Sequence, residues 1–194
     1  GKGLVKKQSH QLWANYIGNL SDNKYSYVSD LNFLYSIDLD WITINTQLLQ
    51  SSLENKNIQT QDKYKLHFIN DFIDIKLGDL YPVIDEYALK GHHIRGLMAS
   101  FKYSSLTIDI IKGQSARAIQ GDPSDNAMFI SNIDSTSDLW NFTVNRDKYT
   151  FQQDLFAFKI SLGQRKNIFW DWSIIKVEDN IETIAKELSN AEIL

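Results

Sequence analysis

The sequence predicts an all-β fold, an antiparallel up-and-down meander of about eight to ten strands that forms a barrel or a strongly curved sheet. Three observations predict it. Apolar residues recur with a period of two, not 3.6, along most of the chain. The alternation changes phase at short polar turns. The two prolines, Pro82 and Pro123, both lie outside the alternating runs, as expected because proline is excluded from central strands.

The first hairpin is the clearest. In residues 31–39, Phe33 and Tyr35 share one face while Ser36 and Asp38 share the other, and after Asp40 the alternation resumes in a new phase. A phase change at a short polar stretch is typical of a hairpin. The same pattern predicts three more hairpins, with turns at residues 70–71, 104–105 and 163–167. Weaker alternation in residues 11–18 and 24–30 indicates two further strands.

The connections between hairpins are long, at residues 50–62, 80–92 and 114–153. One end of the sheet would therefore carry tight turns and the other end long loops, as in outer-membrane β-barrels. A soluble β-sandwich remains open as an alternative, because its Greek-key links also vary in length.

The last residues, 179–194, are expected to differ from the rest. Ile181, Ile184 and Leu188 fall at helical spacing, and the polar residues before them can cap a first turn. The expected organisation is a single β domain over residues 1–194 that ends in a short amphipathic helix.

Composition excludes several functions. The net charge of −4 provides no basic field for nucleic acid. The absence of cysteine excludes a thiol nucleophile and cysteine-bound metal. No apolar run of about 18 residues is present, but a membrane-spanning strand needs only about 10 residues with every second one apolar.

Candidate chemical groups do not combine into a reaction centre. His92 and His93 are adjacent, so on a strand they would point to opposite faces and could not share a metal. Asp38 and Asp40 read as a solvated strand end. We therefore expect no enzyme activity, no cofactor and no metal. Gly78 and Gly96 are expected to permit a bulge or a close approach between strands.

The segment from Ile73 to Gly121 resembles a strand–loop–strand module of uncharacterised outer-membrane β-barrel proteins of Gram-negative bacteria. Its motifs are "GD-x-YP", "L-x-G-x-x-x-RG" and "G-x-x-x-RA-x-x-G", formed by Gly78, Asp79, Tyr81 and Pro82, by Leu89, Gly91, Arg95 and Gly96, and by Gly113, Arg117, Ala118 and Gly121. A weaker similarity to a later hairpin of such proteins covers residues 154–180, and the whole resemblance extends over roughly Tyr64 to Asn180. The resemblance implies a barrel in the outer membrane and no known activity. The module is typical of barrels with more strands than the eight to ten expected here. The chain is therefore expected to be either a fragment of such a barrel or a divergent soluble relative.

The expected function is thus a non-enzymatic outer-membrane barrel or barrel segment in contact with the lipid bilayer, acting in passage, anchoring or surface display. The alternative is a soluble periplasmic or extracellular module that binds a glycan or small molecule. Trp170 and Trp172 share a face and fit core packing, a membrane-facing surface or a sugar-stacking platform. With Arg95 and Arg117 they are the candidate ligand-binding residues. One face of the sheet is expected to carry the polar set Asp38, Asn45, His67, Asp74, Lys76, Lys102, Asp109, Lys159 and Asp171.

Overall fold

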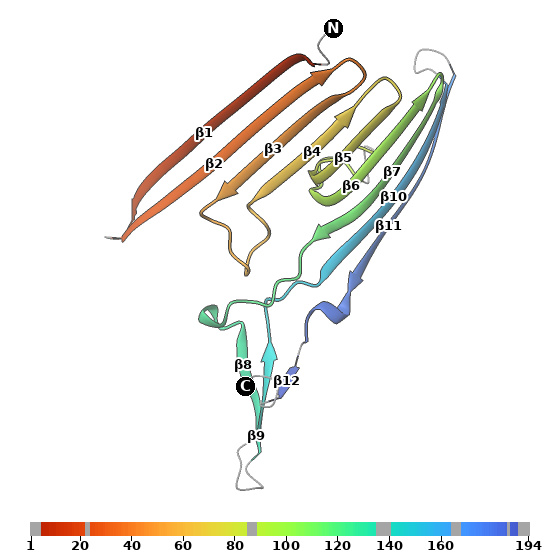
Figure 1. Ribbon diagram of the computed structural model, residues 1–194. Coiled ribbons are helices and arrows are strands. Elements are labelled where there is room, and N and C mark those ends of the chain that lie inside the picture. Colours follow the sequence, from red (N-terminus) through yellow and green to blue (C-terminus); the bar gives the residue numbers. More distant parts are fainter. Residues whose placement is uncertain are drawn as a thin grey trace.

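A computed structural model describes residues 5–21, 24–84, 89–134, 141–163, 168–185 and 187–189. The chain is all-β, as predicted, and its main element is one antiparallel sheet of nine strands in the order β1-β2-β3-β4-β5-β6-β7-β10-β11 (Figure 1). The strands are β1 (Val5–Ser21), β2 (Lys24–Leu39), β3 (Thr43–Ser51), β4 (Lys63–Ile69), β5 (Ile73–Leu80), β6 (Ile94–Tyr103), β7 (Leu106–Ala116), β10 (Gln152–Gly163) and β11 (Phe169–Asn180).

The sheet is curved and open. Within the described residues, β1 and β11 are its two edge strands and do not pair with each other. Of the two expected forms, the structure therefore has the curved sheet and not the closed barrel. The paired strands of all four predicted hairpins are present, while residues 164–167 of the fourth turn lie outside the described residues. The expected strands at residues 24–30 and 31–39 are a single strand, β2.

A second, three-stranded sheet lies beyond the end of the main sheet opposite the β2–β3, β4–β5 and β6–β7 turns (Figure 1). It contains β8 (Met128–Asp134), β9 (Asn141–Arg146) and β12 (Glu187–Ser189), in the order β12-β9-β8. The prediction of one long loop over residues 114–153 is wrong in this respect, because the stretch contains the 3-10 turn η1 (Pro123–Asp125) and the hairpin β8–β9. Both strands are short, and their alternation is too brief to stand out.

The described residues at the C-terminal end do not form the expected helix. Asn180 caps only the 3-10 turn η2 (Ile181–Thr183), where its side chain accepts a hydrogen bond from the backbone N–H of Glu182. Ile184 is buried, and the chain then adds β12 to the edge of β9. Strand pairing thus replaces helix formation in this part, while residues 190–194 lie outside the described residues.

The register of the strands separates two faces of the main sheet. One face, the polar face, carries the whole predicted polar set, because the cross-strand pairs Ser36↔Asn45, His67↔Lys76 and Lys159↔Asp109 keep polar side chains on the same side. The opposite face, the apolar face, carries rows such as Ile44↔Phe68 and Ile110↔Phe158. The alternation of polar and apolar residues along each strand therefore gives the sheet two chemically different faces.

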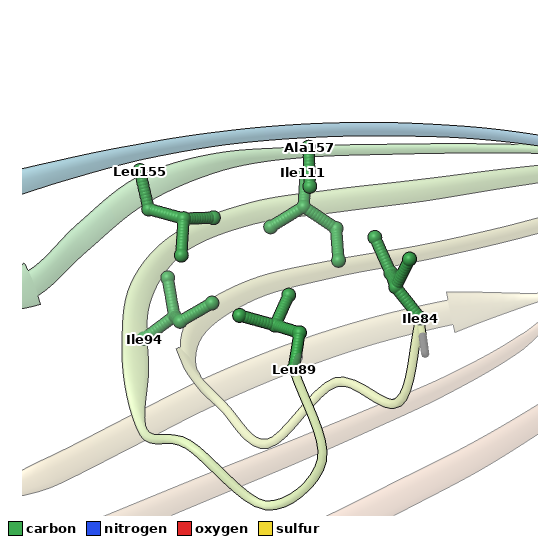
Figure 2. Packing of buried hydrophobic residues seen from close by; sticks show 6 residues of the cluster. All are labelled: Ile84, Leu89, Ile94, Ile111, Leu155 and Ala157. Atoms are coloured by element: carbon green, nitrogen blue, oxygen red, sulfur yellow. The ribbon is translucent and has the colours of Figure 1, made fainter. Parts of the chain in front are cut away.

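The chain between β5 and β6 folds back onto the polar face. Residues 81–84 and 89–93, here called the covering segment, place Ile84 and Leu89 against Ile94, Ile111, Leu155 and Ala157 (Figure 2). These six side chains are buried and form the core cluster. The core thus lies between one segment and one half of a sheet, not between two layers.

Glycines make room where the covering segment begins. Gly78, Gly96 and Gly113 stand side by side on β5, β6 and β7. A Cβ atom on Gly96 would collide with the Lys112 carbonyl, and one on Gly78 would collide with the Tyr64 carbonyl. Gly78 also has a φ of +96°, which disfavours other residues. The predicted close approach at Gly78 and Gly96 is confirmed.

Candidate functional site: the two faces of the sheet

The polar face carries a series of side-chain hydrogen bonds that crosses the sheet. On β4 and β5, the Asp74 carboxylate bonds His67 Nε2 at 2.8 Å and Lys76 Nζ at 3.1 Å. On β10 and β11, Lys159 Nζ lies 2.8 Å from Asp171. Opposite charges on this face are therefore compensated along β5, by Asp74 and Lys76, and between β10 and β11, by Lys159 and Asp171.

The covering segment occupies one half of the polar face. Besides the core cluster, Lys159 Nζ donates a 3.0 Å hydrogen bond to the carbonyl of Ile84. Val83 and Lys90 form an isolated antiparallel bridge that draws the two arms of the segment together. The covering segment thus covers the polar face of β6, β7 and β10 near the end of the sheet at which β5 ends and β6 begins.

The other half of the polar face contains a hollow of about 320 Å³. It is lined by Ser9, His10, Gln11, Leu34, Tyr35, Ser36, Asn45, Thr46, Gln47, Lys65 and His67, from β1 to β4. No aspartate or glutamate is among these residues, so hydroxyl, amide and cationic groups set its chemistry.

The apolar face is exposed over the width of the sheet. Large apolar side chains with 37% or more of their surface exposed occur there on strands from one edge to the other. They include Leu12, Leu31, Leu48, Leu77, Leu97, Phe101, Ile110, Phe156, Leu162, Trp170, Trp172 and Ile174. Apolar side chains are thus exposed on this face from one edge of the sheet to the other.

Exposed aromatic residues gather near both ends of the strands. Trp41, Phe72 and Tyr103 lie at the hairpin turns, and Tyr16 and Tyr64 lie near the opposite ends of their strands. Exposed aromatic side chains thus form two bands, one near each end of the strands.

A buried ion-pair network links the C-terminal end of β5 to the N-terminal end of β6. Asp79, with 3% of its side chain exposed, accepts two 3.1 Å hydrogen bonds from the Arg95 guanidinium. It also accepts the Tyr64 backbone N–H at 2.6 Å and lies 2.7 Å from His93 Nε2. The guanidinium further donates to the Asp62 carbonyl and stacks over the Tyr64 ring. Asp79 therefore organises the exit of β5 and the return of β6.

A second network fixes the loop before β4. Glu54 lies 2.6 Å from Arg117 Nη1, and it accepts the backbone N–H groups of Gln61 and Asp62. Burial alone would raise the pKa of Glu54, but these N–H groups and the Arg117 guanidinium outweigh it and hold the pKa below its ordinary value. Arg117 also donates to the Ile58 carbonyl at 2.7 Å.

We expect the replacement of Arg117 by glutamine to loosen this loop. The substitution removes the charged partner of Glu54 and the donor to the Ile58 carbonyl, so trypsin should cleave after exposed Lys56 several-fold faster. Replacing Lys148, whose ion pair with Asp125 is exposed, is the control and should leave that rate unchanged. An unchanged cleavage rate in the Arg117 variant would contradict the anchoring role.

The pH dependence of the same loop has a definite sign. The folded-state pKa of Glu54 is lowered, so its contribution to stability is present above the ordinary pKa of a glutamate. That contribution is lost as the pH falls through the lowered folded-state value. Hydrogen exchange of the Gln61 and Asp62 amides should therefore lose protection in strong acid, and a Glu54→Gln variant should show reduced protection already at neutral pH.

The four sequence-predicted ligand residues do not converge on one site. Trp170 and Trp172 lie on the apolar face of edge strand β11, where Trp172 packs edge-to-face against Phe158. Arg95 and Arg117 are held in the two networks above. His93 bonds Asp79 and His92 is exposed, while no cluster of groups suited to a metal occurs in the part of the chain that the structure describes.

Sequence reasoning missed the hollow and the acidic anchor Glu54, and it named Asp79 only as part of a motif and not as an ion-pair anchor. Asp79 continues the alternation of the apolar face, so a charge there is a signal that could have been noticed. Glu54 carries no comparable signal, because its charged partner, Arg117, lies 63 residues away in the sequence.

Among the described residues, no helix is long and apolar enough to span a membrane. The chain matches no protein-family model, and neither the comparison with curated proteins nor that with solved structures found a similar chain.

Proposed function

We propose that this chain forms part of the wall of a membrane β-barrel, with its apolar face against lipid and its polar face lining an aqueous lumen. The outer membrane is the location that this architecture suits, because barrels of this kind occur there. The observation that carries the proposal is the apolar face, which runs from β1 to β11 and is covered by no described element.

Strand length and aromatic placement support the same proposal. Strands β3, β6, β7, β10 and β11 contain 9 to 12 residues, which suits the roughly 9–11 residues that a tilted strand needs to cross a bilayer. The aromatic bands near the two ends lie where the interfaces would be. The alternative, a soluble β-sandwich, requires a second layer over the apolar face.

Closure of the barrel follows a simple rule of strand direction. Consecutive neighbours in the sheet are antiparallel, so the first and ninth strands, β1 and β11, run in the same direction. A wall that closes with antiparallel pairs throughout must therefore place an odd number of additional strands between them. A single lipid-facing sheet without such strands would leave both edges unpaired, which is costly in hydrocarbon.

The replacement of Ile110 by arginine tests the membrane surface. Ile110 is 40% exposed in the middle of β7. If this face meets lipid, the arginine should lower the free energy of unfolding from lipid vesicles by about 2–4 kcal/mol. If the face meets water, the change should stay within about 0.5 kcal/mol. Ile110→Leu is the control.

The solvent requirement of the purified chain gives the second readout. A membrane wall should remain monodisperse only in detergent or lipid, because its apolar surface otherwise drives association. A chain that is monomeric at high concentration without detergent, and in which Ile110→Arg is neutral, would overturn the proposed function.

A further inference from the structure

We propose that the hollow over β1–β4 is a binding site for a small hydroxylated organic anion, such as a sugar acid. The inference deepens the proposed function, since it names the solute class that the uncovered half of the polar face would admit. Its starting point is the asymmetry of that face, where the covering segment occupies one half and leaves the hollow open in the other.

The charge of the hollow favours an anion. Lys65 is the one lysine among the lining residues, and no ion pair of its ammonium group is found in the described part of the chain. The other lysines near the centre of the polar face differ, because Lys76 is paired with Asp74 and Lys159 with Asp171. With no carboxylate in the lining, Lys65 keeps its charge available to a ligand.

The neutral groups of the hollow present hydrogen-bond donors. The Ser36 hydroxyl donates to Asn45 Oδ1 at 2.7 Å, which leaves the Asn45 amide N–H groups as donors to a ligand. His67 Nε2 is engaged by the Asp74 carboxylate, so that the ring is held in place on the floor of the hollow. Gln11 and Gln47 add amides that serve hydroxyl groups as donor or acceptor.

Shape and size agree with a small polar solute. A volume of about 320 Å³ lies near the lower end of the range for small-molecule pockets, roughly 300–1,000 Å³. The lining contains few apolar side chains, Leu34 being the main one on the polar face. A hydroxyl-rich sugar ring with a carboxylate forms hydrogen bonds with more of the lining polar groups than an apolar ligand does.

Calorimetric titration of the full chain in detergent micelles or lipid nanodiscs tests the site with three sugars of one ring type. Glucuronate should bind more tightly than glucose, and glucosamine, which carries a positive charge, should bind most weakly. Lys65→Gln should weaken glucuronate binding by about tenfold or more, because a charge-assisted hydrogen bond is lost. Lys65→Arg should retain most of the affinity.

Lys102→Gln is the matched control, because Lys102 lies on the same polar face outside the lining of the hollow. It should leave glucuronate binding unchanged. Equal binding of the three sugars, no measurable binding of any of them, or no effect of Lys65→Gln would overturn the inference. These results do not depend on the solvent requirement or on Ile110→Arg, so the failure of this site and the failure of the membrane proposal are distinguishable.

Discussion

Replacing Asp79 by alanine is expected to lower the free energy of unfolding by about 3–5 kcal/mol, the usual effect of removing one partner of a buried ion pair. Asp79 is almost fully buried and accepts hydrogen bonds from Arg95 and from the Tyr64 backbone. Its loss leaves the Arg95 guanidinium without its carboxylate partner and the Tyr64 backbone N–H without its acceptor. Chemical unfolding in detergent or lipid, followed by circular dichroism, measures the effect.

Two further variants show whether the loss of stability comes from the unpaired charge of the Arg95 guanidinium. The double variant Asp79→Ala/Arg95→Met should recover part of the lost stability, because no unpaired guanidinium remains. Asp40→Ala is the control, since the Asp40–Lys6 pair is 58% exposed on both sides and should contribute about 0–1 kcal/mol. Equal effects of Asp79→Ala and Asp40→Ala would show that the network at the loop end is not structural.

The meander was predictable because its cause is local. Each hairpin is specified by a few consecutive residues. For example, Asp40 separates the alternating residues of β2 from those of β3. The polar set was predictable for the same reason, because a period of two fixes the face of every residue once the strands are known. Register then joins residues such as Asp109 and Lys159 without further information.

The remaining features depend on contacts that the local pattern does not contain. The hydrophobic residues Ile84 and Leu89 lie in a stretch that reads as a loop, and only the tertiary structure shows that they pack against Ile111. Ile181 and Ile184 have helical spacing, yet pairing of β12 with β9 decides the conformation of the chain end. Arg95 was predicted as a ligand-binding residue, but in the structure its guanidinium pairs with Asp79, a contact that the local pattern does not indicate.

Exchange of Leu89 for aspartate should release the covering segment without unfolding the sheet. Leu89 is 3% exposed in the core cluster, so a carboxylate there would be buried without a partner. Because the segment can leave the face, the loss of stability is limited to its docking energy, of the order of the 2–5 kcal/mol found for large core truncations. Trypsin should then cleave after Lys90 at least tenfold faster, while the strand signal in circular dichroism stays constant.

Ile111→Asp provides the contrast, because Ile111 belongs to β7, between β6 and β10, and cannot leave the cluster without breaking the sheet. That variant should lose the strand signal itself. If Leu89→Asp unfolds the sheet as fully as Ile111→Asp, the segment is an inseparable part of the core. If it leaves cleavage after Lys90 unchanged, the segment is not held by Leu89. Faster cleavage with an intact sheet would mean that the sheet keeps its form by strand pairing alone, and that the segment is a separable cover on half of the polar face.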